Sequence, residues 1–409
     1  MPEISVKFPL SPMDPSSFRL LELPPDLCKL VEASLDGDLG YVASLYCSSL
    51  LTQERLSIKG SREEDAVLCT PDKTYAIRSV ALSNSVLVLT SPPSKEAAST
   101  DMDIEDSSNH VVIQESLKEI LELVPTVPKL HRLRTMLRGM EWEEGHEDED
   151  DEFDAEGDKQ PRRRRYTYEQ ARSELQASDR EIDAAIKEKH ILVINGALRP
   201  IAPSYLHTIL ELLLTSLVSL SQPHESASVV ELATALESDH EIQREVSCQV
   251  MRWFGDITGE DDEERWRVDV SGVVKQIGLG VLRHYKDETI PETDFIQKWR
   301  NAVGDTFEAE VTMEMLAGNY LSSSPSLSSL AAEPKASQLL TYFPRAELPT
   351  DPALRFSDLF LTRARWKATD ITPFLEDIAV DAKDRDRLLL KYARAVTDVD
   401  GPWYTARAR

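Results

Sequence analysis

Residues 166–202 read YTYEQARSELQASDREIDAAIKEKHILVINGALRPIA, and this stretch decides the fold. Its apolar spacing predicts a short helix followed by a second, amphipathic helix, with Ser178 or Asp179 as the N-cap of the second. Two apolar runs then flank Asn195-Gly196, which is a strong hairpin signal. Helix, turn, helix and hairpin make a winged helix-turn-helix. Such modules bind either nucleic acid or protein, and the fold alone does not say which.

The same element order returns along the rest of the chain without a sequence repeat, giving four possible blocks. We therefore predict an α+β multidomain protein with a tandem array of winged-helix domains. The predicted domains are an N-terminal β-barrel-type partner-binding domain at 1–116, a first winged helix at 117–202 with an acidic disordered insert at 141–161, a second winged helix at 203–288, and a C-terminal winged-helix region at 289–409 whose last winged helix is 354–409.

Residues 1–116 contain short apolar runs separated by turn signals, which is typical of strands. The runs AVLC (66–69) and TYAIR (74–78) flank a Pro-Asp-Lys turn and predict a hairpin. We expect an antiparallel sheet or barrel with open edges, which invite pairing with a partner chain. Residues 117–139 are expected to be helical on both sides of the break at Pro125–Pro128.

Composition limits the function classes. The 409 residues carry a net charge of −26, which argues against nucleic-acid binding by the whole molecule and favours protein contacts. No apolar run approaches the roughly 18 residues of a membrane span, so no membrane partner is expected. The four cysteines are scattered and form no CxxC, which predicts free thiols and no metal site.

No motif for catalysis or cofactor binding occurs in the sequence. There is no GxxxxGK[ST], GxGxxG, GxSxG or HExxH. Gly278-Leu279-Gly280 lies in an apolar helical pattern and predicts close helix packing. The tryptophans Trp253, Trp266, Trp299, Trp366 and Trp403 lie at helix or strand positions and are predicted to be core residues. We predict a protein that is not an enzyme and needs no cofactor.

The charge of the last block is the clearest functional signal. Residues 354–409 hold eleven basic and nine acidic side chains, a balance of +2, so the other 353 residues carry −28. A helix predicted over 384–396 would present three cations on one face, as a recognition helix does. The candidate DNA-binding residues are Arg363, Arg365, Lys367, Lys383, Arg387, Lys391 and Arg394. The alternative is that these cations pair with the interleaved aspartates, which stabilises little.

An acidic tract, residues 141–158, precedes a basic cluster. The tract holds twelve carboxylates without a lysine or arginine, a composition that favours disorder. Binding of histones by this tract, or mimicry of DNA, is a minor alternative. The cluster is Arg162, Arg163, Arg164 and Arg165, a candidate nuclear import signal or phosphate contact. The other interpretation, a solvated basic turn, stays open. We expect the protein to be nuclear.

Three segments carry a family resemblance. They are FRLLELPPDLCKLVE (18–32), IKGSREEDAVLCTPDKTYAIRSVALSNSVLVL (58–89) and RFSDLFLTRARWKATDITPFLEDI (355–378). They resemble the "defective in sister chromatid cohesion" family, an accessory subunit of the alternative (chromosome transmission fidelity) replication factor C clamp loader. The sequence departs from the family in residues 35–54 and in the acidic tract.

The resemblance implies a non-ATPase subunit that scaffolds the loader for PCNA loading and sister chromatid cohesion. It implies an N-terminal part that joins the large and small chromosome-transmission-fidelity subunits. It further implies winged helices that reach single- and double-stranded DNA and the catalytic subunit of DNA polymerase epsilon. Residues 166–202 are the candidate polymerase contact. PCNA would be reached indirectly.

Two other functions compete with this interpretation. A free-standing winged-helix DNA-binding transcription regulator would need a self-sufficient N-terminal domain and a strongly basic recognition helix. A DNA-processing enzyme with a divergent site would need clustered metal ligands or a nucleotide-binding loop. The net charge disfavours the first, and the absence of such motifs disfavours the second.

Overall fold

The structure is a computed structural model with mixed α+β architecture and several small sheets. It describes residues 5–7, 18–35, 56–90, 110–143, 145, 165–259, 263–323, 338–398 and 401–407. The chain divides into two compact units, residues 1–126 and 127–409.

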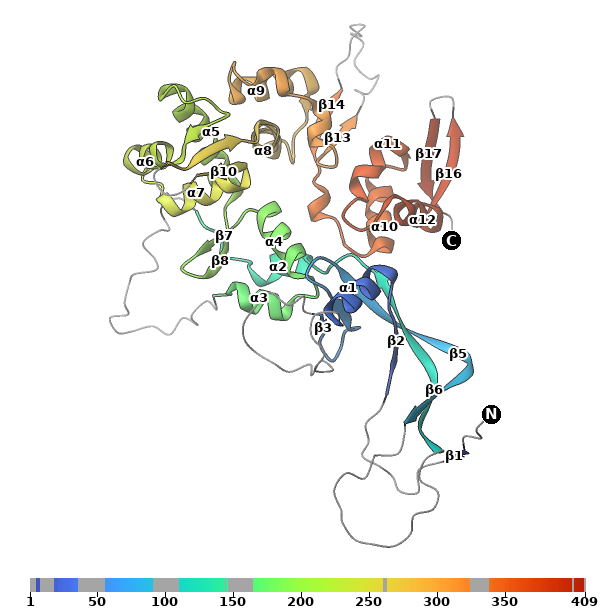
Figure 1. The fold of residues 1–409 in the computed structure, drawn as a ribbon. Helices are drawn as coiled ribbons and strands as arrows, with labels where there is room; N and C mark the ends of the chain where they lie inside the picture. The colour runs from blue at the N-terminus through green and yellow to red at the C-terminus, as the bar shows by residue number, and fades with distance from the viewer. Residues whose placement is uncertain are drawn as a thin grey trace, which may run out of the picture. The chain divides into compact units, whose positions relative to one another are not determined.

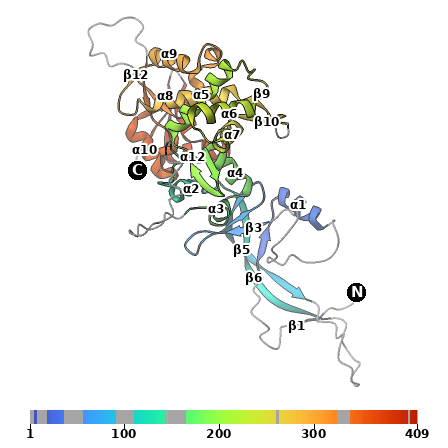
Figure 2. The same ribbon diagram turned by 90° about the vertical axis from the view of Figure 1, so that its left-hand side faces the viewer.

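A long antiparallel pair of strands dominates the first unit. β5 (Thr74–Thr90) and β6 (His110–Pro125) pair along most of their length, with register shifts after Ala81 and Val88 (Figure 2). β4 (Val67–Cys69) and β3 (Ser57–Lys59) extend the sheet from the start of β5. The predicted hairpin at 66–78 is therefore confirmed.

The outer edge of β6 carries two short strands that run parallel to it. β1 (Ser5–Lys7) pairs with its beginning and β2 (Leu20–Glu22) with its later part. α1 (Pro25–Leu35) follows β2. The sheet is therefore mixed, and across the described residues it does not close into a barrel. This corrects the expected antiparallel sheet or barrel: both N-terminal strands pair on the outer edge of β6 in its own direction, and neither pairs with β3 at the opposite edge.

The helix predicted over residues 117–124 is wrong, because this segment is the second half of β6. The buried side chains Ile113, Leu117 and Leu123 are separated by even numbers of residues, which is the spacing of one strand face. Pairing with β5 overrides the local helical preference of the sequence SLKEILEL. β6 also continues through the domain boundary expected at residue 116.

The first block of the second unit follows the predicted order. It contains α2 (His131–Met136), α3 (Tyr168–Glu174), α4 (Asp179–Glu188), β7 (Ile191–Ile194) and β8 (Ala197–Pro200).

Local capping explains why this block folds where the sequence predicts. Ser178 caps α4 in a capping box with Glu181, which confirms the expected helix start. Asn195 and Gly196 have φ angles of 51° and 76°, the left-handed conformation that a tight hairpin turn requires. Thr167 adds an antiparallel bridge to Ala197 of β8.

Three further blocks follow (Figure 1). The second contains α5 (Pro203–Ser219), β9 (Ala227–Ser228), α6 (Val229–His240), α7 (Arg244–Trp253), β10 (Gly255–Thr258) and β11 (Arg265–Val268). The third contains α8 (Val270–Arg283), β12 (Ile290–Pro291), α9 (Glu292–Val303), η3 (Glu308–Glu310), η4 (Met313–Leu316), β13 (Tyr320–Ser323) and β14 (Leu339–Tyr342). The fourth contains η5 (Arg345–Glu347), α10 (Pro352–Thr362), β15 (Arg365–Lys367), α11 (Ala368–Ile371), η6 (Thr372–Phe374), α12 (Ala382–Tyr392), β16 (Ala393–Asp398) and β17 (Gly401–Ala406).

All four blocks share one strand arrangement. In each, a first strand or bridge precedes the second helix, and the block ends in two strands. The last strand lies in the middle: β11 between β10 and β9, β14 between β12 and β13, and β17 between β15 and β16. In the first block β8 likewise lies between β7 and the bridge at Thr167. The blocks therefore share one strand topology, although no sequence repeat accompanies it.

Large aromatic side chains fill the cores of the second unit. Trp266, Trp299 and Trp366 are fully buried, as predicted. Trp253 and Trp403 are only partly buried. Trp253 still packs against a buried hydrophobic cluster, in keeping with its prediction. Trp403 does not belong to the described core cluster of the last block, so the prediction that it is a core residue is wrong.

Gly278 allows α8 and α9 to pack closely. A Cβ atom at Gly278 would lie 2.4 Å from Cε2 of Trp299, whose indole nitrogen donates to the Val274 carbonyl at 2.8 Å. The predicted close packing at Gly278-Leu279-Gly280 is confirmed.

Gly278→Ala is expected to destabilise the protein by up to about 2 kcal/mol. Alanine gains about 1 kcal/mol of helix propensity, but forcing a methyl group against a fixed indole costs about 1–3 kcal/mol. Urea denaturation measures the difference. Lys275→Ala, at an exposed position of the same helix, is the matched control and should change the free energy of unfolding by under about 0.5 kcal/mol. A stabilised Gly278→Ala variant would contradict the packing argument.

Candidate functional site

The sheet of the last block has one face on the core and one face in solvent. Trp366 and Ala393 belong to the inner face and are buried. The outer face holds Arg365 and Lys367 of β15, because side chains alternate along a strand. Arg365 and Lys367 lie on either side of the buried Trp366 in β15, so their side chains point to the solvent-facing side of the sheet.

The strand register brings the outer-face residues of three strands together. Thr405 of β17 lies between Arg365 and Arg394, its partners on the two neighbouring strands. Trp403 lies between Lys367 and Val396 in the same way. In Figure 1, β16 and β17 form the red hairpin next to α12.

Cations cover the Trp403 indole. The Arg365 guanidinium lies 4.5 Å from the ring centroid, and the Lys367 ammonium lies 5.4 Å from it. Arg365 also pairs with Asp398 at 2.6 Å, with both side chains 44% exposed. The indole nitrogen of Trp403 is buried and has no acceptor among the residues that the structure describes. Sequence reasoning missed Trp403 as a surface residue. The available signal was the alternation of side chains along the strands RWK (365–367) and PWY (402–404), which places Trp366 and Trp403 on opposite faces of the sheet.

The expected recognition helix ends earlier than predicted. α12 stops at Tyr392, so Arg394 lies on β16 and does not share a helix face with Arg387 and Lys391. The prediction of three cations on one face of a helix at 384–396 is therefore wrong. The extended backbone of Ala393 (φ −122°, ψ 163°) turns the chain into the strand, because pairing with β17 begins there.

The cations that remain on α12 are exposed and partly matched by aspartates. Arg387 lies 3.5 Å from Asp384 and is 71% exposed. Lys391 lies over the Tyr392 ring at 5.0 Å, and Lys383 is exposed. Among the described residues, therefore, only some of the cations of this helix have a carboxylate partner.

Arg363 is held at the junction of the third and fourth blocks. It donates to the Ser322 carbonyl, lies 3.5 Å from Asp370, and stacks over Trp366 at 4.9 Å. These residues line a small cavity of about 90 Å³. Arg363 therefore connects two blocks and does not belong to the outer sheet face.

Of the candidate nuclear signal, Arg162, Arg163 and Arg164 lie outside the described residues. Arg165 is described and exposed, directly before the bridge at Thr167. The acidic tract also lies almost entirely outside them.

The first unit exposes many apolar side chains on its sheet. The exposed side chains there are Val6, Phe18, Leu20, Leu21, Ile58, Val86, Leu87 and Leu89. Leu87 and Leu89 are 49% and 47% exposed. In the described residues, β4 pairs with β5 only at residues 74–76, so β5 has a strand partner on one edge alone from Arg78 to Thr90. Such an edge is a template for another strand.

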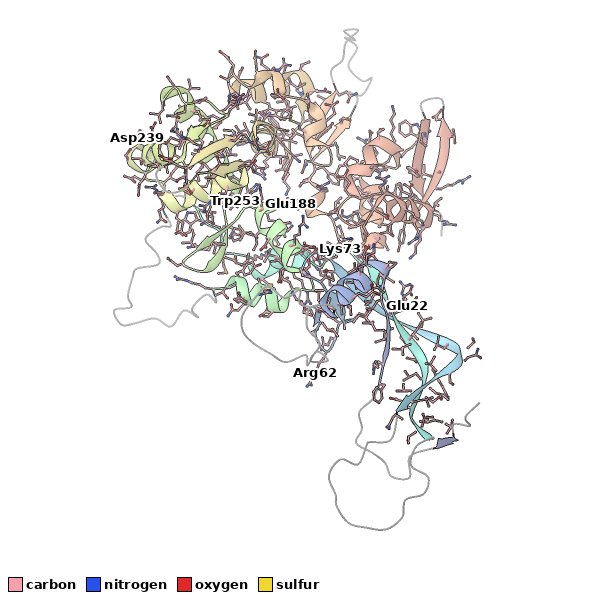
Figure 3. The ribbon with its side chains drawn as sticks, viewed as in Figure 1. Glu22, Arg62, Lys73, Glu188, Asp239 and Trp253 are labelled. Carbon is pink, nitrogen blue, oxygen red and sulfur yellow. The ribbon has the colours of Figure 1, made fainter. Side chains whose placement is uncertain are left out.

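A compact junction joins the first and second blocks. The side-chain amide of Gln249 on α7 accepts from the Val193 nitrogen and donates to the Val193 carbonyl, both at 2.9 Å. His190 stacks on Phe254 at 5.2 Å and lies 5.4 Å from Trp253. Trp253 is labelled in Figure 3. Burial lowers the pKa of His190 to about 4, and the nearby Arg283 charge lowers it too. No sequence pattern predicts this junction.

Metal-ligand clusters and membrane-spanning helices are both absent from the described residues. No group of three or more His, Cys, Asp or Glu side chains there could hold a metal ion. No helix in that part of the chain is long and apolar enough to cross a membrane.

An open sheet with apolar side chains in solvent, together with four helix-and-hairpin blocks and a basic sheet face, is typical of a protein that binds other macromolecules. Comparison with known families identifies which kind of macromolecule-binding protein this is. The family model described as "Sister chromatid cohesion protein Dcc1" matches residues 18–375, so the chain belongs to this family. Membership supports a role in sister chromatid cohesion and bears out the resemblance found in the sequence.

Individual relatives are similar over most of their length. Sister chromatid cohesion protein DCC1 of Xenopus laevis is 26% identical over 385 residues, covering 92% of this chain and 86% of the relative. The protein of the same name from Mus musculus is 24% identical over 382 residues, covering 92% and 84%. That of Saccharomyces cerevisiae is 24% identical over 208 residues, covering 49% and 52%.

Proposed function

We propose that the protein is a non-catalytic subunit of the alternative replication factor C clamp loader in the nucleus. In this role it scaffolds the loader and tethers it to DNA and the leading-strand polymerase for PCNA loading and sister chromatid cohesion. The observation that carries the proposal is the edge of β5 from Arg78 to Thr90, which no strand in the described part of the chain pairs with, and the exposed Leu87 and Leu89 beside it. Membership of the Dcc1 family supports the role in sister chromatid cohesion.

The partners of this edge are strands from the large and small chromosome-transmission-fidelity subunits, which complete the sheet. Strand addition supplies main-chain hydrogen bonds to the unpaired edge and covers apolar side chains at the same time. A single strand added to residues 78–90 satisfies both needs. This accounts for apolar side chains in solvent on a chain with a charge of −26.

Each block of the second unit acts in this proposal as a winged helix. The shared order of helix, strand, two helical segments and two strands, with the last strand central, supports this assignment. The first block, with residues 166–202, contacts the catalytic subunit of DNA polymerase epsilon. The last block contacts DNA through its cations.

The test is purification of the tagged full-length chain from nuclear extract, followed by mass spectrometry. The wild-type chain should carry replication factor C subunits with it. Leu87→Lys/Leu89→Lys places charges beside the open edge and should reduce their recovery at least tenfold, since buried unpaired charges oppose association. Val218→Lys is the matched control, because Val218 is 69% exposed on α5.

Each result of this purification supports or contradicts a different part of the proposal. Retention of the loader subunits by the control and their loss from the double lysine variant support the proposal. Equal recovery with both variants would show that the β5 edge is not the contact. Absence of replication proteins from the wild-type sample would overturn the assignment to the clamp loader.

A further inference from the structure

We propose that the outer face of the β15-β17-β16 sheet binds single-stranded DNA, with an unpaired base stacked on the indole of Trp403. Phosphates of the same strand lie on Arg365, Lys367 and Arg394. The inference rests on the proposed function and deepens it, since it names the strand state of the DNA and the surface that holds it.

The strand register supplies the charge complementarity. Arg365 and Arg394 flank Thr405, and Lys367 flanks Trp403, so three cations share one sheet face with the indole, and two of them, Arg365 and Lys367, lie against its ring. The only carboxylate on the described part of this face is Asp398. A cationic groove with an aromatic side chain between the charges is the general design of single-strand binding surfaces.

Trp403 has features of a stacking residue. Its ring is partly exposed, while Trp366 on the opposite face of the sheet is fully buried. Its buried indole N–H has no acceptor among the described residues, which is unfavourable for a buried donor. A base carbonyl or phosphate oxygen can accept this hydrogen bond when the strand binds.

The contacts that now cover the ring can be exchanged at low cost. Arg365 and Asp398 are both 44% exposed, and exposed pairs of this kind contribute little stability. When phosphates replace Asp398 as the partner of Arg365, the guanidinium can leave the ring. The ring face then becomes available to a base, and the charge of the arginine stays paired.

α12 is less suited to this role. Arg387 is 3.5 Å from Asp384, and Arg385 is 3.5 Å from Asp386, so aspartates are interleaved with its cations. No tryptophan lies on this helix. α12 can attract phosphate by charge, but its aromatic residue, Tyr392, stacks on Phe356 at 5.4 Å and packs against the core of the block.

The experiment measures binding of the full-length chain to a fluorescent thymidine oligonucleotide and to a duplex of equal length. Trp403→Ala should weaken single-strand affinity by roughly 5- to 150-fold, the effect of losing one stacked base. Duplex affinity should change by less than about twofold, because paired bases do not reach the ring. Trp403→Phe should restore most single-strand affinity.

Arg387→Ala/Lys391→Ala on α12 is the matched comparison. Removing these charges should weaken single-strand and duplex binding by similar, modest factors and lower the salt dependence of both. Circular dichroism confirms that each variant is folded, and recovery of affinity by Trp403→Phe shows that stacking, not folding, was lost.

Three results would overturn the inference: unchanged single-strand affinity in Trp403→Ala, equal losses for single strand and duplex, or no binding of either probe by the wild-type chain. The first two results leave the proposed function intact, whereas the third would also contradict DNA contact by the last block. The assignment to the clamp loader is tested separately, because Trp403→Ala should still recover replication factor C subunits from nuclear extract. The variant Leu87→Lys/Leu89→Lys should show the opposite result. It should lose the replication factor C subunits and still bind the oligonucleotide, so the two proposals are tested independently.

Discussion

Replacing Arg355 with alanine is expected to lower the free energy of unfolding of the last block by about 3–5 kcal/mol. The Arg355 side chain is 1% exposed. Its guanidinium donates to the Pro349 carbonyl at 2.7 Å, the Phe374 carbonyl at 2.8 Å and the Leu348 carbonyl at 3.3 Å. It also binds both carboxylate oxygens of Asp377. Alanine leaves these acceptors unpaired in the core.

Guanidine denaturation followed by tryptophan fluorescence measures this loss. Arg387→Ala is the matched control, because it removes the same charge from the same block at a side chain that is 71% exposed. The control should change stability by less than about 1 kcal/mol. Arg355→Met/Asp377→Leu should recover part of the loss, since no charge is then left unpaired. Equal stability of Arg355→Ala and the control would refute the structural role of this pair.

Acidification is expected to weaken the junction between the first and second blocks, which His190 occupies. Burial against Phe254, with Arg283 nearby, lowers the pKa of His190 from its ordinary 6.5 to about 4. The unfolded chain therefore binds a proton that the folded chain does not bind between these two pH values. Stability is at its full value above about pH 6.5 and falls as the pH falls towards 4, by about 2–3 kcal/mol in total.

Urea denaturation at several pH values between about 7 and about 4.5 measures this slope. His190→Asn removes the titrating ring and suits the left-handed backbone at this position, where φ is 51°. This variant should show a shallower decline with acidity than the wild-type chain. His284→Gln is the matched control at an exposed histidine and should keep the wild-type slope. Identical slopes in all three proteins would contradict the assignment to His190.

Local signals in the sequence determined the parts of the fold that depend on neighbours along the chain. The N-cap at Ser178, the turn at Asn195-Gly196 and the close packing at Gly278 were all predictable, because capping, backbone conformation and helix spacing act over a few residues. The family was also recognisable from three segments, and its model matches residues 18–375.

Tertiary structure decided what depends on strand pairing. Residues 117–124 have a helical preference, but pairing with β5 makes them a strand. Pairing with β17 ends α12 at Tyr392 and moves Arg394 from the expected helix face to the outer face of the sheet. The candidate DNA-binding residues were predicted from charge alone, but the placement of Arg365, Lys367 and Arg394 on one sheet face with Trp403 was not. Arg365 and Lys367 lie 40 and 36 residues before their partners Thr405 and Trp403, and register between such distant strands is set by the whole core and not by local sequence.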